Sequence, residues 1–250
     1  MTTQSVFWAL VKHDLRRRKR RNVARSKTWV VLYGTVIAAL VVIVATYVSL
    51  SGQRVDLTDA WVFTYVLPFM SFGLTIGLLV HEWKDGTAGW WLSLPMSRLR
   101  LVTSKFVAAL IRMILLVAAV YCATGLLILY TMVLEGNFNA HTAGQFLLTG
   151  LKYDGLFLCV CPFIAAFGVL IGVLTESRAK PIMPLIWLVF GCSWWLIFSW
   201  HGGTVHIQHT HGLAGFSLAP IFYYLIVASW IVAYLMIRLT SYVLERQMAS

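Results

Sequence analysis

The chain has 250 residues, of which 60% are hydrophobic and only 12% are charged, and its mean hydropathy is +0.79. This composition excludes a soluble globular domain and predicts a protein with several membrane spans. The net charge of +11 does not indicate a nucleic-acid-binding protein, because the basic residues gather at the start of the chain and in short segments between apolar runs.

Residues 1–27 form a basic cytosolic segment ahead of the first apolar run. They contain nine of the twenty lysines and arginines, and residues 6–11 within them are mostly apolar. This pattern predicts an amphipathic elbow helix that lies on the membrane surface and is attracted by anionic lipid. The residues assigned to that surface are Arg16, Arg17, Arg18, Lys19, Arg20 and Arg21. A basic patch that only sets topology is the alternative.

Six apolar runs reach or approach the roughly 20 residues that a helix needs to cross about 30 Å of hydrocarbon. They cover residues 28–50, 61–80, 106–134, 155–174, 181–200 and 218–237. Each span must satisfy its own backbone hydrogen bonds in lipid, so we predict an all-α fold. Residues 28–250 then form one polytopic transmembrane domain of six helices, because the segments between the runs are too short for a second domain.

The distribution of basic residues predicts the orientation of this domain. Eighteen of the twenty lie on one side of the six-span layout, and only Arg54 and Lys152 lie on the other. Basic residues are enriched in cytosolic loops, so both termini are expected in the cytosol. The predicted location is a cell membrane of the bacterial plasma-membrane type, with the chain crossing it several times.

Four ionisable residues fall inside or beside the predicted spans: Lys105, Arg112, Asp154 and Glu176. All four lie near predicted helix ends, from which a charged side chain can reach water. The sequence therefore predicts no proton relay or ion pathway within the bundle.

The segment from His81 to Lys105 is polar and patterned, although it lies between two apolar runs. The pattern consists of Asp85, Gly86 and Thr87 at a helix break, Trp90, Trp91 and Leu94 on one face of a short helix, Pro95 at its end and Ser97 before the next helix. Such a short amphipathic helix would lie across the membrane surface, where a soluble partner could grip it. An ordinary interfacial loop anchored by tryptophans is the alternative.

The same segment resembles the loop after the second span of type-2 ATP-binding-cassette (ABC-2) exporter permeases. The shared pattern is E-x-x-x-G-T followed by L-P-x-S-R-x-x-L-x-x-x-K, which begins at Glu82 and ends at Lys105. In that family the segment forms a coupling helix that docks on a separate ATPase subunit. The resemblance implies coupling roles for Glu82, Gly86, Thr87, Trp90, Trp91, Leu94, Pro95, Ser97 and Arg98. Glu82 and Arg98 would be polar anchors, whereas the double tryptophan is bulkier than the residues common at that place.

The resemblance also implies a set of partners. Two ATPase subunits would bind ATP and Mg²⁺, and a second permease subunit would complete a homodimer or heterodimer. Membrane lipid would surround the complex. Nucleic acid is not an expected partner. A smaller second inner contact would involve Glu176, Ser177 and Arg178. The chain itself would bind no cofactor. It would be the permease subunit of an exporter.

The remaining motifs do not indicate an enzyme. The sequence lacks G-x-x-x-x-G-K-[ST], H-E-x-x-H and G-x-S-x-G, so any ATP must bind to another chain. Its dispersed glycines, such as Gly168 and Gly172, have the small-xxx-small spacing that favours close helix packing.

Two alternative functions rest on weaker patterns. The outer loop at residues 201–216 contains weak candidates for metal ligands in His206, His209 and His211, and Cys159 and Cys161 precede a proline. These residues are compatible with a standalone metal or ion transporter. A non-transporting membrane immunity protein that sequesters a toxic peptide is the other alternative.

A second outer segment, residues 135–152, is predicted to contain a short helix on the outer leaflet.

Overall fold

The computed structural model describes residues 3–16, 32, 34–36, 39–47, 61, 66–136, 138–177, 179–188, 191, 205–210, 213–218 and 221–248. Most of these residues are helical, as predicted. Within them, three helices are long and apolar enough to cross a membrane: α5 (Arg98–Leu134), α6 (Ala140–Leu174) and residues Tyr223–Arg246 of α8 (Ile221–Met248). They correspond to the third, fourth and sixth predicted spans. Residues 39–47 of the first span are also helical, and most of the fifth lies outside the described residues.

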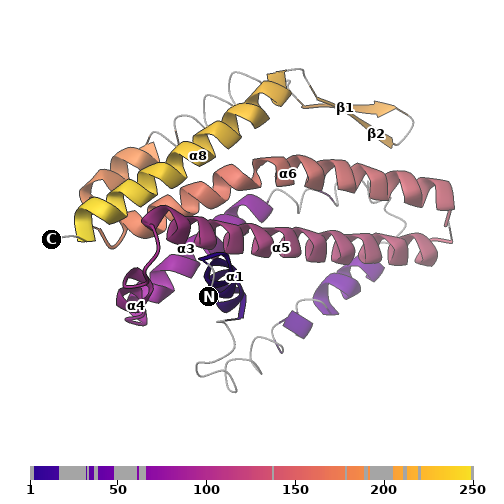
Figure 1. The fold of residues 1–250 in the computed structure, drawn as a ribbon. Helices are drawn as coiled ribbons and strands as arrows, with labels where there is room; N and C mark the ends of the chain where they lie inside the picture. Colours follow the sequence, from indigo (N-terminus) through magenta and orange to yellow (C-terminus); the bar gives the residue numbers. More distant parts are fainter. Residues whose placement is uncertain are drawn as a thin grey trace.

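The two longest helices, α5 and α6, lie side by side and extend beyond their predicted spans (Figure 1). They have 37 and 35 residues, which correspond to lengths of about 55 and 52 Å at 1.5 Å per residue. The prediction of a separate short helix within residues 135–152 is wrong, because α6 is continuous from Ala140. Asn139 begins it, since its side chain accepts a hydrogen bond from the backbone N–H of His141 at 2.9 Å.

Helix α3 (Leu67–Lys84) packs against α6 through two glycines, as their spacing predicted. A Cβ atom at Gly168 would lie 2.8 Å from the Cβ of Thr75, and one at Gly172 would lie 2.9 Å from the Cβ of Leu79. These distances are shorter than van der Waals contact, so only glycine permits this approach of the two helices.

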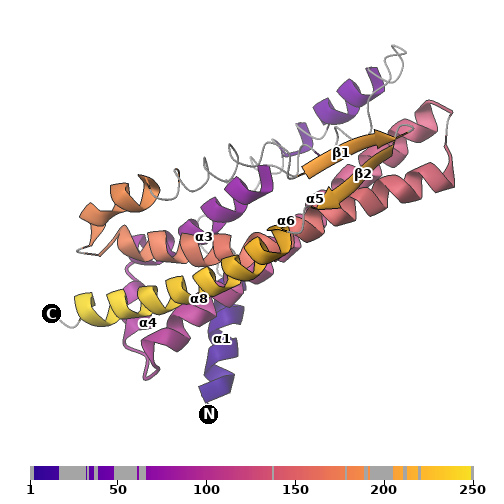
Figure 2. The same ribbon diagram turned by 90° about the horizontal axis from the view of Figure 1, so that it is seen from above.

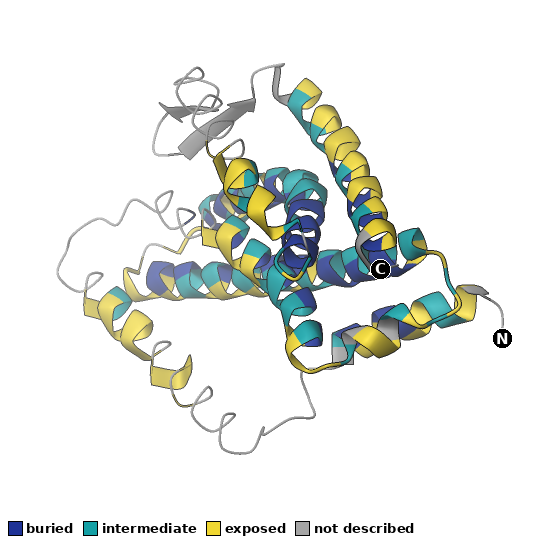
Figure 3. Cartoon of the chain, turned by 90° about the vertical axis from the view of Figure 1, so that its left-hand side faces the viewer, coloured by how far each residue is buried: buried dark blue, intermediate teal, exposed yellow. Residues whose placement is uncertain are grey.

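Helix α1 (Thr3–Arg16) crosses α5 at a steep angle, which the two perpendicular views show together (Figures 1 and 2). Its buried face contains Leu10, Val11 and Asp14, while Trp8 and His13 lie on its exposed face (Figure 3). The predicted amphipathic helix is therefore present at 3–16. Its contact with lipid stays a prediction, because the basic run from Arg17 to Arg21 lies outside the described residues and the side chain of Arg16 is not described.

The bundle has two ends with different cores. We call the end that carries α4 (Ala88–Leu92) and the last turns of α8 the hairpin end, and the end that carries the α5–α6 turn the turn end (Figure 1). The hairpin-end core joins α1, α3, α5, α6 and α8, and consists of Leu10, Leu79, Leu101, Val102, Ala166, Val169, Val173, Ala233, Ile237 and Leu244. The turn-end core consists of Trp61, Ile128, Met132, Ala143 and Phe146.

Two short strands interrupt the helical pattern. β1 (Val205–Thr210) and β2 (Leu213–Leu218) pair antiparallel, with Val205 opposite Leu218 and Thr210 opposite Leu213. The sequence predicted an outer loop over residues 201–216 and a span that starts at 218. Valine, isoleucine and phenylalanine in this segment favour extended backbone, and α8 begins only after β2 has ended.

Candidate functional site

The predicted helix break after α3 is present and has a specific local structure. Gly86 has φ of +68°, a conformation that side chains with a Cβ disfavour. Its N–H donates to the carbonyl of Trp83, and the N–H of Thr87 donates to the carbonyl of Glu82, both at 3.0 Å. This is the hydrogen-bond pattern of a Schellman motif, which ends a helix and turns the chain sharply. We call residues 82–98, from this break to the start of α5, the α4 hairpin.

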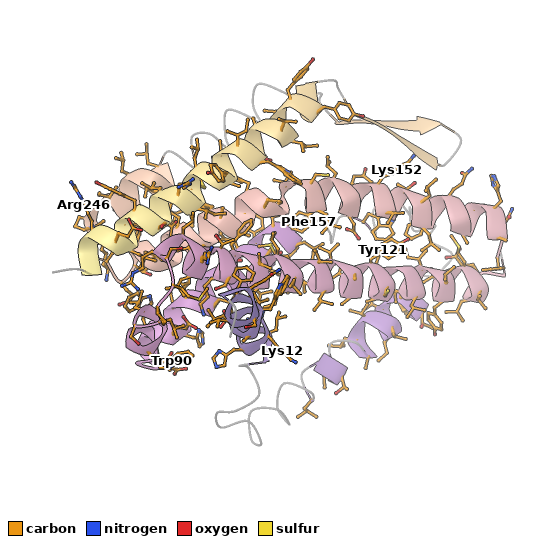
Figure 4. All side chains as sticks on the ribbon, in the orientation of Figure 1. Lys12, Trp90, Tyr121, Lys152, Phe157 and Arg246 are labelled. Carbon is orange, nitrogen blue, oxygen red and sulfur yellow. The ribbon has the colours of Figure 1, made fainter. Side chains whose placement is uncertain are left out.

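The short helix α4 places one tryptophan on the surface. The side chain of Trp90 is 56% exposed at the hairpin end (Figure 4). Leu94 does not share that exposed face, because α4 ends at Leu92 and Leu94 packs against the hairpin-end core. The side chain of Trp91 is not among those described. The predicted apolar ridge of three residues is therefore reduced to Trp90 in the part of the α4 hairpin that the structure describes.

Contacts within the chain fix the turn that connects α4 to α5. The guanidinium of Arg98 donates to the carbonyl of Leu92, which ties the first residue of α5 to the last residue of α4. Ser97 occupies the N-cap position with extended backbone, but its side chain makes no capping hydrogen bond. Pro95 lies in the turn between the two helices. Arg98 was expected to anchor a partner, and the structure places it in an internal contact instead.

A cluster of buried charges lies behind the α4 hairpin. Lys105 of α5 is 1% exposed, and its Nζ lies 2.8 Å from both carboxylate oxygens of Asp14 in α1. The same Nζ donates to Oε1 of Glu82 in α3, and the guanidinium of Arg112 donates to the main-chain carbonyl of Asp14. We call Asp14, Glu82 and Lys105 the ion cluster. Asp14 and Glu82 are 1% and 4% exposed.

The burial of charged side chains changes three sequence-based predictions. Lys105 does not reach water from a helix end, because it is enclosed by two carboxylates from other helices. Asp154 is also buried, at 3% exposure, near the middle of α6 rather than at its start. Glu82, expected to be an anchor for a partner, lies inside the chain's own ion cluster. Taking such charges out of water is costly, and they persist in proteins when opposite charges meet in good geometry.

The sequence contains a signal for this cluster at Asp14 that the search for apolar runs and motifs does not reveal. Asp14 is the only acidic residue among the first 55, and it falls in line with Phe7, Leu10 and Val11 on the buried stripe of an otherwise basic segment. A lone carboxylate at such a position needs a buried cation. Its partner could not be identified from sequence, because Lys105 is distant along the chain.

The surface beside the ion cluster is shared by α1 and the α4 hairpin. A half-open pocket there is lined by His13, Glu82, Thr87 and Trp90. The rings of His13 and Trp90 lie 6.1 Å apart, centroid to centroid, and the His13 side chain is 52% exposed. Thr87 turns its hydroxyl back to the carbonyl of Glu82 at 3.2 Å. A partner that binds Trp90 would therefore also contact α1.

The other predicted sites are only partly described. Glu176 is exposed after α6, and the Ser177 hydroxyl donates to the carbonyl of Leu174 at 3.1 Å, but Arg178 lies outside the described residues. His206 and His209 lie on β1, whose side chains are not described, and His211 lies outside the described residues. Both the second inner contact and the metal site stay predictions.

Comparison with known proteins gives one family match. The family model described as ABC-2 family transporter protein matches residues 8–235, a range that runs from α1 into α8 and contains the α4 hairpin and the ion cluster. No curated protein and no solved structure matches the chain.

Proposed function

The chain belongs to the ABC-2 family of transporter proteins, and from this premise we propose that it is the permease subunit of an exporter driven by a separate ATPase. In this proposal two ATPase subunits bind ATP and Mg²⁺ and hydrolyse the nucleotide. A second permease subunit, identical or related, completes the translocation path in a cell membrane. The direction of transport follows from the resemblance of the α4 hairpin to the coupling segment of exporter permeases.

The observation that carries this proposal is the position of the α4 hairpin. It presents an exposed Trp90, it is held at one side by the Gly86 turn and at the other by Arg98, and it rests directly on the hairpin-end core. Packed protein interiors have low compressibility. A displacement of the hairpin is therefore expected to reach the five helices that meet in that core.

The charges at the hairpin end support a cytosolic location for it. Arg98, Arg100 and Arg112 lie on the first half of α5, and Arg238 and Arg246 lie on the last turns of α8. Basic residues mark the cytosolic side of membrane proteins, where the ATPase subunits would be. The turn end offers Lys152 as its only lysine or arginine among the described residues.

The transport mechanism follows from a two-state bundle. ATP-driven closure of the two ATPase subunits moves both α4 hairpins, and the helices packed on them tilt from an inward-facing to an outward-facing arrangement. Nucleotide chemistry takes place on the partner. The chain contributes the path, the docking surface and the transmission of movement.

The docking surface is tested by removing Trp90. The variant Trp90→Ala is compared with Phe138→Ala, because both aromatic side chains are 56% exposed and lie at opposite ends of the bundle. A central interface tryptophan contributes about 2 kcal/mol or more, so co-purification with the ATPase should weaken about 30-fold in Trp90→Ala only. Undiminished association and ATP hydrolysis in Trp90→Ala would overturn the assignment.

The orientation is tested by labelling single cysteines from either side of the membrane. Gly89 of α4 and Gly144 of α6 both have open space where a Cβ would lie, so a cysteine fits at each. After replacement of the native cysteines, an impermeant maleimide should reach Gly89→Cys only from the cytosol and Gly144→Cys only from outside. Labelling of Gly89→Cys from outside would exclude contact with a cytosolic ATPase.

A further inference from the structure

The ion cluster joins three elements through one ammonium group. Lys105 comes from α5, Asp14 from α1 and Glu82 from the end of α3, next to the Gly86 turn. A single Nζ contacts both carboxylates, so α1 and the base of the α4 hairpin are held at the same point. Among the described elements, α1 packs chiefly on α5, and no comparable contact joins it directly to α3.

A second contact fixes the same residue of α1. Arg112 lies two helical turns after Lys105, on the same face of α5, and its guanidinium donates to the main-chain carbonyl of Asp14. Asp14 is thus held by its side chain and by its backbone. Rotation or sliding of α1 on α5 would break both contacts together.

Buried ion pairs restrict motion more strictly than apolar contacts do. Apolar surfaces can slide over one another with little change in buried area, because the hydrophobic effect has no direction. A buried carboxylate 2.8 Å from an ammonium has no such freedom, since a shift that separates the pair leaves a buried charge without compensation. The ion cluster therefore specifies one relative position of α1, α3 and α5.

The contact between His13 and Trp90 extends this joint to the surface. His13 precedes Asp14 on α1, and Trp90 is the exposed tryptophan of the α4 hairpin. The surface that a partner would press therefore lies beside two of the three buried charges, because His13 precedes Asp14 on α1 and Glu82 lines the same pocket as Trp90.

We propose that the ion cluster is a positioning joint that makes α1 and the α4 hairpin move as one body, so that the elbow helix is displaced along the membrane surface whenever the hairpin is displaced. This inference rests on the proposed function, which supplies the force. It gives α1 a part in transmitting movement and not only in anchoring the chain. Asp14, Glu82 and Lys105 are positioning residues, because none of them touches substrate or nucleotide in this role.

The joint is tested by measuring distances between spin labels in the full complex, after replacement of the native cysteines. Labels are placed at Lys12, which is exposed on α1, at Gly89 on α4 and at Gly144 near the turn end. Distances are compared between nucleotide-free protein and protein trapped with ATP and vanadate. The 12–89 distance should stay narrow and unchanged, whereas the 12–144 and 89–144 distances should change together.

The variant Lys105→Met removes the shared ammonium group. Its expected result is a broad 12–89 distance distribution in both states and a 12–144 distance that no longer follows the 89–144 distance. Lys152→Met is the matched control, because it removes an exposed lysine at the turn end and should leave all three distances as in the unaltered protein. If Lys105→Met does not fold, Glu82→Gln serves instead, since it keeps the Asp14–Lys105 pair and should broaden only the 12–89 distribution.

Two results would overturn the joint. One is a 12–89 distance that changes with nucleotide in the unaltered protein, and the other is a 12–89 distribution that stays narrow in both Lys105→Met and Glu82→Gln. Failure of the proposed function has a different signature, in which no distance responds to nucleotide. In that case the width of the 12–89 distribution in the variants still decides whether the ion cluster holds the two elements together.

Discussion

Buried charges hold the hairpin end of the bundle together, whereas stacked aromatic rings hold the turn end. At the hairpin end, Lys105 pairs with two carboxylates within a core that five helices share. At the turn end, Trp61 is 2% exposed and stacks on Tyr121 and Phe146, with ring centroids 5.5 and 5.0 Å apart. The helices are therefore held together by ion pairs at the hairpin end and by aromatic stacking at the turn end.

The difference indicates how each end responds to movement. Ion pairs require one geometry, so the hairpin end is suited to receive and pass on a displacement. Stacked aromatic rings gain most of their stabilisation from buried surface area, and they tolerate several offset arrangements. The turn end can therefore rearrange with a smaller penalty while the hairpin end moves as a unit.

The largest expected effect comes from Lys105→Met. It leaves Asp14 and Glu82 as buried carboxylates without their shared cation, and such a change costs about 3–5 kcal/mol of unfolding free energy. Reversible unfolding in mixed detergent micelles measures this loss, and exposed Lys152→Met should stay within about 0.5 kcal/mol of the unaltered protein. A loss below about 1 kcal/mol would mean that the hairpin end depends on apolar area, as the turn end does.

The matching change at the turn end is Trp61→Ala. It removes a buried indole that rests on Gly150, where a Cβ atom would lie 1.9 Å from the indole ring. We expect a loss of about 3 kcal/mol in the same unfolding assay, from lost contacts and the remaining space. Trp61→Phe, which keeps one ring for stacking, should recover more than half of it. Equal losses in both variants would show that the indole ring is needed for more than stacking.

A smaller effect is expected from Gly86→Ala at the hairpin end. A Cβ there meets no other atom, so the penalty comes from the positive φ alone and is about 1–2 kcal/mol. Gly89→Ala is the control, because it also has open space but no positive φ, and a helical alanine should not destabilise it. A neutral Gly86→Ala would indicate that the α4 hairpin can adopt another turn.

The smallest effect is expected from Asn139→Ala at the turn end. This change removes the hydrogen bond that the side chain accepts from His141 at the start of α6, which is worth about 1 kcal/mol. Asn139→Ser keeps a capping oxygen and should cost little. Thermal unfolding separates the two variants, and identical behaviour would show that α6 begins without help from this cap.

Local patterns in the sequence were enough for much of the fold. Composition predicted a helical membrane protein, and three apolar helices of membrane length confirm that class among the described residues. Gly86 predicted the helix break, and the spacing of Gly168 and Gly172 predicted close packing of another helix, which the structure identifies as α3. Each of these features depends on residues that are near one another along the chain.

Two predictions about local structure were wrong because helix ends depend on few residues. Leu94 was placed beside Trp90 by helical spacing, but α4 stops at Leu92, and the Ser93 hydroxyl donates to the carbonyl of Trp90 at 2.8 Å. Beyond Leu92 the helical spacing no longer predicts which side chains share a face. At the turn end, the Asn139 cap starts α6 well before the apolar run that predicted it.

The sequence by itself determined the class of protein, the position of the hairpin and the resemblance to a transporter family. Only the tertiary structure decided which charges are buried. Asp14, Glu82 and Lys105 come from three helices, and whether a charged side chain meets water, lipid or an opposite charge depends on which helices cross at that point. Helical periodicity assigns each residue to a face of its own helix, but the partner on the facing helix is set by the packing of the whole bundle.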